Sequence, residues 1–283
     1  MRKILVLTDF SDNAYNALDC AHRFYQNDPC EIILLHSIEP QMSTSTSRID
    51  YGKKVQIYEA LEAEVEKEFE TFLARLPGLD DGQHTYRTEL TTEELHKKVN
   101  DLIANEDIDL VLMGVKGRTA ARDIFMGSNT VKIVRSVVGC PVLAIPENHQ
   151  YIPPVKFALA TNFRRPIHQR QLERLVALVK YMDARLDIIH IFEEGDKLTT
   201  EQLANKALLE SNLEEVNYHY QWLPDTGVEK SKIIGEYTRE NGYHLLAMLF
   251  HKRSFFDRLF REKVIKRIGF HTDIPFMVIP EID

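Results

Sequence analysis

The sequence lacks the side-chain clusters that mark a familiar catalytic or metal centre. It has three cysteines in 283 residues, Cys20, Cys30 and Cys140, and no Cys-x-x-Cys pair. This scarcity argues against a disulfide framework and favours reduced thiols. No histidine has neighbours with zinc-ligand spacing, and no Ser-His-Asp or Cys-His arrangement stands out. We therefore expect no catalytic residue of these kinds and no metal held directly by side chains.

Long apolar runs and an excess of positive charge are also missing. The start of the chain, MRKILVLTDF, is too short to span a membrane, and no small-residue cleavage site follows it. We interpret it as a strand and expect a cytoplasmic protein without a transmembrane segment. The 35 basic and 43 acidic residues give a net charge of −8. That balance argues against binding nucleic acid or anionic membranes through bulk charge.

The chain repeats itself once. Each half opens with a strand-like segment, KILVLTDF or KFALATNF, and continues with an apolar run that reaches a histidine, His36 or His190. Each half closes on a similar segment, PVLAIPE or PFMVIPE. Matched blocks in the same order predict two copies of one domain, at residues 1–147 and 154–283, joined by the polar linker NHQYIPP.

Apolar strands alternate with helical patterns in the first copy. We expect strands over 4–7, 32–36, 86–90, 110–113 and 142–145, and helices after an N-capping Ser11, over 55–76, after a Thr91/Glu94 capping box and over 128–138. Continuously apolar strands that are each followed by a helix indicate a parallel sheet covered on both faces. We predict an α/β fold with two tandem, doubly wound domains of five parallel strands. Ligands of such sheets bind outside the carboxyl ends of the strands.

Three of the 12 glycines fall in one segment, GVKGRTAARDIFMGSNT, which we call the glycine stretch (residues 114–130). An apolar strand leads into it and a helical pattern leads out. Glycine lets the backbone approach a polyphosphate, and a helix start adds unpaired amides and the positive end of a dipole. The stretch is therefore a candidate phosphate-binding loop. The alternative is a glycine-rich surface loop with an N-capping serine.

The glycine stretch lacks the Gly-Lys-Ser/Thr of a P-loop and the Gly-x-Gly-x-x-Gly of dinucleotide-binding folds. Its pattern Gly-x2-Gly-x9-Gly-Ser resembles that of the ATP-binding branch of universal stress proteins. Gly114, Gly117, Gly127 and Ser128 match this pattern at full spacing. LTDFS resembles the family's Pro-Thr-Asp-Phe-Ser, with Leu7 in place of proline, and LLHSIEP resembles its Leu-Leu-His-Val. The resemblance covers essentially the whole chain and implies a tandem member with the adenine nucleotide alpha hydrolase-like fold.

The resemblance also implies a ligand, which is ATP or else ADP or AMP, with Mg²⁺ held mainly through phosphate oxygens. The residues implied beside the adenosine are Thr8, Asp9 and Ser37, with Gly114 by the ribose and α-phosphate. Those implied around the phosphates are Gly117, Gly127, Ser128 and Asn129, with Thr130 nearby. For Asp9 the sequence alone allows another role, as a carboxylate that caps the following helix.

The second copy has lost the glycines. Its matching segment, MLFHKRSFFDRLFREKVIKRIGF from Met248, has none at the corresponding positions, and Asn162 replaces Asp9. We therefore predict that this copy does not bind ATP in the manner of the family. Residues 252–267 carry seven basic and two acidic side chains, a net charge of +5. They form either a docking surface for an anion, an acidic partner or a membrane headgroup, or a solvated helix face.

Three functions stay open at this point. The leading hypothesis is a non-catalytic stress-response protein in which ATP orders the glycine stretch and biases a surface that an unknown protein partner contacts. The second is a slow ATPase or nucleotide hydrolase, in which Asp9 orients water and Lys116, Arg118 and Arg122 supply charge. The third is an interaction protein that needs no nucleotide and uses the basic second domain.

The family resemblance has one more implication, which concerns the last strand of each copy. PVLAIP and PFMVIP are expected to pair across the two copies, so that one chain takes the form of a dimer. A homodimer of the whole chain stays open.

Overall fold

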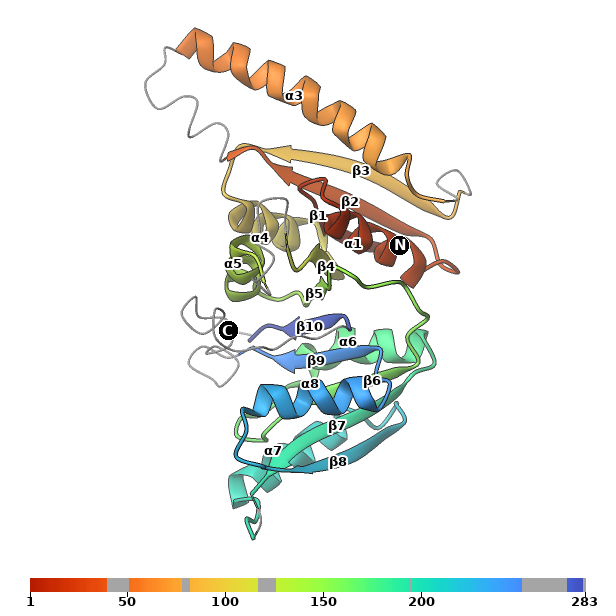
Figure 1. The fold of residues 1–283 in the computed structure, drawn as a ribbon, viewed down its shortest axis with the longest axis vertical. Coiled ribbons are helices and arrows are strands. Elements are labelled where there is room, and N and C mark those ends of the chain that lie inside the picture. The colour runs from red at the N-terminus through yellow and green to blue at the C-terminus, as the bar shows by residue number, and fades with distance from the viewer. Residues whose placement is uncertain (40–50, 78–81, 117–125, 194, 251–273, 282–283) are drawn as a thin grey trace.

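The fold follows the alternation seen in the sequence (Figure 1). The computed structural model describes residues 1–39, 51–77, 82–116, 126–193, 195–250 and 274–281. The strands are β1 (Arg2–Leu7), β2 (Cys30–Ser37), β3 (His84–Thr91), β4 (Leu110–Gly114), β5 (Val142–Ile145), β6 (Lys156–Ala160), β7 (Arg185–Phe192), β8 (Tyr218–Pro224), β9 (Leu245–Leu249) and β10 (Phe276–Ile279). The helices are α1 (Asp12–Phe24), α3 (Tyr51–Leu73), α4 (Leu95–Glu106), α5 (Ser128–Ser136), α6 (Gln169–Tyr181), α7 (Thr200–Ser211) and α8 (Lys230–Glu240).

The strands form one sheet in the order β3-β2-β1-β4-β5-β10-β9-β6-β7-β8. The first half has the order 3-2-1-4-5, and the second half repeats it from the opposite end. Within each half all neighbouring strands pair in parallel. Within the described residues, the prediction of two doubly wound domains, each with five parallel strands, is confirmed.

The two halves meet through their last strands. β5 and β10 pair antiparallel, with Leu143 opposite Met277, so the expected pairing of PVLAIP with PFMVIP is confirmed. An ion pair extends the junction beyond the sheet. Arg174 of α6 contacts the carboxylate of Asp109, which also accepts the amide of Lys3 at 2.9 Å. The junction therefore joins the backbone of both halves and anchors α6 to the start of β1.

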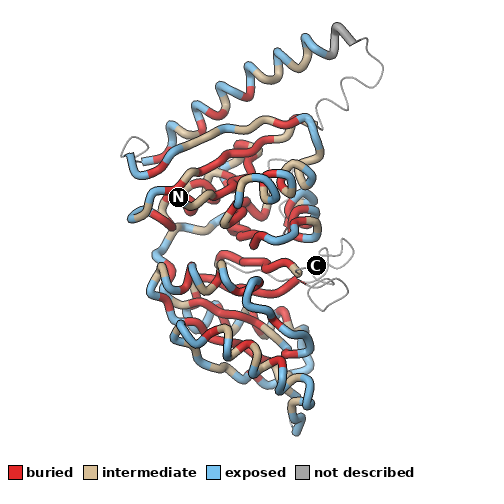
Figure 2. Tube along the Cα trace, turned by 180° about the vertical axis from the view of Figure 1, so that it is seen from behind, coloured by how far each residue is buried: buried red, intermediate tan, exposed pale blue. Residues whose placement is uncertain are grey.

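Most residues of the central strands are buried (Figure 2), and their apolar side chains form a core on each face of the sheet. Alternate residues of β1 point to opposite faces, with Ile4 in one core and Leu5 in the other. Helices α1, α3, α6 and α7 cover the first face, and α4, α5 and α8 cover the second. This arrangement explains why the strands are continuously apolar in the sequence, because neither face is left to solvent.

Of the two helix caps predicted in the first half, one is confirmed and one is wrong. Ser11 caps α1 as predicted, and its hydroxyl accepts the amide of Ala14 at 3.2 Å. The predicted Thr91/Glu94 capping box is wrong, because α4 has Glu94 as its N-cap and no side-chain cap. Thr91 ends β3 instead, and its hydroxyl accepts the amide of Glu93 at 3.1 Å. β3 thus extends to Thr91, the residue that the capping box would need as the N-cap of α4.

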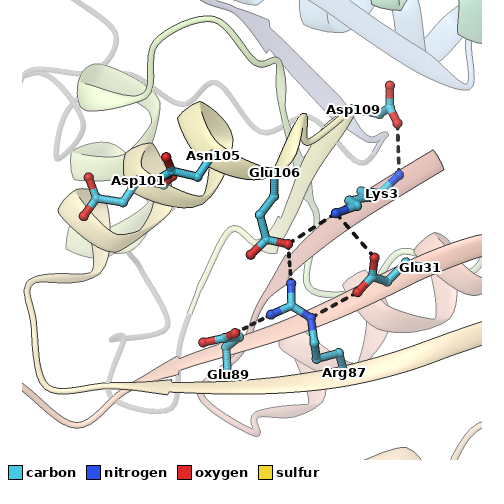
Figure 3. Close-up of polar contacts among 8 residues, drawn as sticks. All are labelled: Lys3, Glu31, Arg87, Glu89, Asp101, Asn105, Glu106 and Asp109. Carbon is cyan, nitrogen blue, oxygen red and sulfur yellow. Dashed lines mark hydrogen bonds and ion pairs between the residues drawn. The ribbon is translucent and has the colours of Figure 1, made fainter. Parts of the chain in front are cut away.

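A network of charged side chains ties β1, β2, β3 and α4 together (Figure 3). Arg87 is at its centre, with Nε 3.0 Å from Glu31, one guanidinium nitrogen 2.5 Å from Glu106 and another on Glu89. Lys3 adds its ammonium at 3.4 Å from Glu106 and 3.7 Å from Glu31. One guanidinium therefore balances three carboxylates that would otherwise repel one another.

The pKa of Glu106 lies below its ordinary value. Burial acts to raise it, but the hydrogen bonds and charges of Arg87 and Lys3 outweigh that effect. A carboxylate with a depressed pKa in the folded state stabilises the fold above its unfolded pKa, and this contribution is lost as the pH falls through the folded value. The network therefore stabilises the protein at neutral pH and weakens in acid.

Replacing Arg87 tests this network. We expect Arg87→Met to lower the free energy of unfolding by roughly 1–2 kcal/mol at pH 7. The deficit should shrink in acid, as the pH falls through the lowered pKa of Glu106. Urea denaturation at pH 7 and pH 3.5 measures both values. Arg170→Met, at an exposed position of α6, is the control and should change neither. An equal deficit at both pH values would assign the role of Arg87 to packing.

Candidate functional site

The carboxyl ends of β1 and β4 form the point where the strand order reverses. From β1 the chain continues to β2 on one side, and from β4 to β5 on the other. A doubly wound sheet leaves a crevice at such a point. Thr8 and Asp9 follow β1, and Gly114 is the last residue of β4. The predicted residues on these two strands therefore lie side by side at the carboxyl edge of the sheet, where ligands of such folds bind.

The turn after β1 is held by its own polar groups. The amide of Thr8 donates to Leu35 at 3.0 Å, and the Thr8 hydroxyl accepts the amide of Phe10 at 2.9 Å. Asp9 Oδ1 accepts the amide of Ser11 at 3.1 Å. Because Ser11 itself caps α1, Asp9 orients the turn and does not cap the helix. Thr8 is buried while Asp9 is half-buried, so Asp9 is the more accessible of the two residues.

Asn13 belongs to the first turn of α1. Its side chain also holds the end of β4 in place. A Cβ on Gly114 would lie 2.7 Å from both Cγ and Oδ1 of Asn13 and 2.9 Å from its backbone carbon. The side chain of Asn13 is buried, donates to the carbonyl of Ile145 at 3.0 Å and accepts the amide of Lys116 at 2.9 Å. The glycine is thus required by the contact with α1, and the contact fixes where the glycine stretch leaves the strand.

Helix α5 begins next to the end of β4. Its N-cap is Gly127, which provides no side-chain cap, and the amide of Gly127 donates to Val115 at 2.7 Å. Helix geometry leaves the amides of the next three residues, Ser128, Asn129 and Thr130, without acceptors inside the helix. Ser128 and Asn129 are exposed. These amides and the positive end of the helix dipole form the anion-attracting part of the site.

Thr130 fastens the glycine stretch to α5. It is 2% exposed, and its hydroxyl lies 3.2 Å from the carbonyls of both Gly114 and Val115. The side chain therefore bonds to backbone and holds the ends of the stretch together. Its hydroxyl is therefore already used, and only its backbone amide is left for an anion at the start of α5. Thr130 thus supports the predicted phosphate contacts by holding the backbone next to them.

Ser37 lies at the end of β2, next to the turn after β1. Its hydroxyl donates to the carbonyl of Glu93 at 2.9 Å and accepts the amide of Glu39 at 3.3 Å. Next to it, His36 bonds through Nδ1 to the carbonyl of Thr8 at 2.8 Å. The ring of His36 is buried against Phe10, with centroids 4.8 Å apart. These contacts give His36 a structural role at the turn after β1.

The lysines that border the helix start are paired with carboxylates. Lys116 lies 2.8 Å from Glu147, and Lys132 lies 2.5 Å from Glu94. Hydrogen bonds from Lys132 and Lys97 lower the pKa of Glu94 to about 2. Among the described residues, the positive potential at the crevice therefore comes chiefly from the backbone of α5.

Eight of the nine predicted contacts lie in the described parts of the chain. Gly117 falls outside them, as do Arg118, Arg122 and the basic residues 252–267. Asn13 is the residue that the sequence reasoning missed. The sign of its role in the sequence was a polar residue just after Ser11, beside the apolar face of α1. At that position it neither caps the helix nor faces solvent. In the parts of the chain that the structure covers, no group of three histidine, cysteine or carboxylate side chains is placed to hold a metal ion.

The second half copies the turn but not the glycine. The hydroxyl of Thr161 accepts the amide of Phe163 at 3.1 Å, and His190 bonds to the carbonyl of Thr161 at 3.0 Å. Gly114 pairs with Ile145 in the first half, and Leu249 pairs with Ile279 at the same point of the second. A buried leucine thus stands where the first half has bare backbone.

Comparison with known proteins places these features in context. The model of the Universal stress protein family matches residues 1–146. Universal stress protein MJ0577 of Methanocaldococcus jannaschii is 26% identical over 153 residues, which cover 51% of this chain and 94% of that protein. A universal stress protein of Archaeoglobus fulgidus superposes with a TM-score of 0.63 at 17% identity, over 99% of this chain and 97% of that one.

The fold also occurs in a membrane-transport context. The cytoplasmic domain of a prokaryotic cation chloride cotransporter superposes with a TM-score of 0.54 at 14% identity, over 98% of this chain and 94% of that one. Such a likeness establishes the fold alone, and one fold hosts many functions. Within the described residues of this chain, no helix combines the length and hydropathy needed to cross a bilayer.

Proposed function

The chain belongs to the universal stress protein family, and from that premise we propose that its first domain, residues 1–147, binds ATP or another adenine nucleotide. The base and ribose lie by Thr8, Asp9 and Ser37, and the phosphates lie against the glycine stretch and the start of α5. A Mg²⁺ ion is held mainly by the phosphate oxygens, as hard cations usually are.

One observation carries the proposal. At the switch point of the first half, Asp9 follows β1 and Gly114 ends the neighbouring β4, and α5 begins at Gly127 without a side-chain cap, so the amides of its first turn are free for an anion. Backbone amides at a helix start attract phosphate. The second domain, residues 154–283, has Leu249 at the matching position. One nucleotide per chain is therefore the expected stoichiometry.

The bound nucleotide has a regulatory role in this proposal. Rapid phosphoryl transfer needs charge stabilisation at the transferring group. The described lysines beside α5 are already paired with Glu147 and Glu94. ATP therefore orders the glycine stretch and changes the surface that a cytoplasmic protein partner contacts. Slow hydrolysis, with Asp9 orienting water, is the competing function.

The decisive experiment is to denature the purified protein and identify any released nucleotide by mass. Protein freed of nucleotide is then melted with ATP, ADP or AMP in the presence of Mg²⁺. A ligand that binds only the folded state stabilises it by about 2.7 kcal/mol at 100 times its dissociation constant. We expect an adenine nucleotide at one per chain and a higher melting temperature with ATP.

Two results would redirect the proposal. No released nucleotide, together with an unchanged melting temperature at millimolar ATP, would favour a nucleotide-independent interaction protein. Single-turnover hydrolysis that falls more than tenfold in Asp9→Ala would favour the hydrolase. The role of residues 252–267 stays a separate prediction, because they lie outside the described residues.

A further inference from the structure

The sheet has two edges, and they differ in how they are protected. β3 forms one edge and β8 the other, at opposite ends of the long axis of the molecule (Figure 1). The edge at β3 carries the charged residues Arg87 and Glu89 and has α3 beside it. β8, with the sequence YHYQWLP, has no lysine, arginine, aspartate or glutamate. Charged side chains are a common means of keeping edge strands from pairing, and β8 lacks them.

The backbone of β8 offers a row of unused hydrogen-bonding groups. The amide of Leu186 donates to Asn217, and that of Asp225 donates to Phe192. In a parallel ladder with this register, residues 217, 219, 221, 223 and 225 face β7. The amides and carbonyls of Tyr218, Tyr220 and Trp222 therefore point outward. Within the described parts of the chain they have no backbone partner.

The three outward-facing residues are also the three aromatic residues of the strand. The rings of Tyr218 and Tyr220 are 6.0 Å apart, and those of Tyr220 and Trp222 are 5.9 Å apart. They form one row on one face of the sheet, because side chains alternate along a strand. Trp222 is 43% exposed. Tyr218 and Tyr220 are half-buried against the core, so Trp222 is the exposed member of the row, at an edge that carries no charged side chain.

We propose that two copies of this chain associate through β8, antiparallel and centred on Tyr220. In this register Tyr220 faces Tyr220 of the second copy, and Tyr218 faces its Trp222. Each of the three facing pairs exchanges two backbone hydrogen bonds, about six in total. The ten-stranded sheets of the two copies then join edge to edge at β8 into one continuous sheet around a two-fold axis.

A second copy suits this edge because the edge is complementary to itself. The outward residues are the same three on both sides of the axis, and facing aromatic pairs stabilise an antiparallel ladder. The flanking charges also balance. Lys206 lies over the ring of Tyr220 at 4.3 Å, and the Tyr220 hydroxyl donates to Glu210 at 3.1 Å. Each copy thus brings one cation and one anion of α7 next to Tyr220, and these two charges balance.

Two substitutions test the proposal in the full-length chain. Tyr220→Pro removes the central outward amide and leaves the ladder with β7 intact, because that amide does not face β7. Trp222→Lys places a charge in the aromatic row. The matched control is Thr88→Lys, at an exposed, outward-facing position of the opposite edge. Sedimentation velocity between 1 and 200 µM measures the dimer dissociation constant.

We expect the wild type and Thr88→Lys to dimerise with the same dissociation constant, and both β8 variants to raise it at least tenfold. Trp222 is the single tryptophan of the chain. Its fluorescence emission should therefore shift to shorter wavelength as the wild type associates and stay unshifted in Tyr220→Pro. Far-UV circular dichroism confirms that the variants fold.

A wild type that stays monomeric at 200 µM would overturn the proposal. So would a dimer that survives both β8 substitutions, or one that Thr88→Lys weakens as much as they do. None of these outcomes depends on nucleotide, because the measurements are made on nucleotide-free protein. Failure here is therefore distinguishable from failure of the proposed ATP site.

Discussion

Gly127→Asp is expected to abolish nucleotide binding while leaving the fold as stable as before. Gly127 has φ −66° and ψ 158° and is the N-cap of α5, a conformation that aspartate adopts readily. Aspartate is among the best N-cap residues, so its carboxylate should bond to the free amides of the first turn. The same carboxylate then occupies and repels the place proposed for phosphate. We expect the affinity for ATP to fall at least a hundredfold.

Isothermal titration of ATP and thermal melting measure the two effects separately. Gly127→Asn is the matched control, because asparagine caps a helix as well as aspartate and carries no charge. It should lose affinity by a smaller factor than Gly127→Asp. If Gly127→Asp binds ATP as tightly as the wild type, the start of α5 does not hold the phosphates. If both variants unfold at lower temperature, the N-cap is strained in a way that its dihedral angles do not indicate.

Gly114→Ala should cost both stability and binding. The added Cβ would lie 2.7 Å from the side chain of Asn13 and 2.9 Å from its backbone carbon, so the end of β4 and the start of α1 must separate. Overpacking of this kind costs about 1–3 kcal/mol. The displacement also strains the bonds from Asn13 to Ile145 and Lys116. ATP binding should therefore weaken together with the free energy of unfolding.

A double-mutant cycle separates this clash from other causes. In an Asn13→Ala background the polar side-chain atoms that Gly114→Ala meets are gone, while the backbone contact stays. Gly114→Ala should therefore cost less in that background than in the wild type, as neighbours in direct contact are coupled. Urea denaturation of the four proteins gives the coupling energy. Additive effects would contradict the explanation from the contact with Asn13.

The strand and helix pattern could be predicted because burial on both faces leaves a direct mark on the sequence. β1 and β4 are apolar throughout, and the two copies of the pattern reinforced one another. The pairing of β5 with β10 followed from the family resemblance. The α4 cap could not be predicted, because a capping box depends on where the preceding strand ends. β3 extends to Thr91 and uses the residue that the motif would need.

The residues of the candidate site were proposed from the sequence, and the contacts that support them were missed. The glycine positions indicated either a phosphate-binding loop or a surface loop, and the family resemblance favoured the phosphate. At Gly114 the close neighbour is Asn13, a contact between residues a hundred positions apart that no local pattern reveals. The hydroxyl of Thr130 likewise turned out to bond to the ends of the glycine stretch. Long-range packing of this kind is set by tertiary structure.

The antiparallel contact of β5 with β10 has a consequence for what each copy must preserve. Two separate subunits joined in this way would come apart on dilution, and each would have to keep every residue that its ligand needs. A covalent tether holds the partners at high effective concentration whatever the amount of protein. The second copy then needs only to preserve its half of the contact. Leu249, at the position that matches Gly114, is compatible with that smaller requirement.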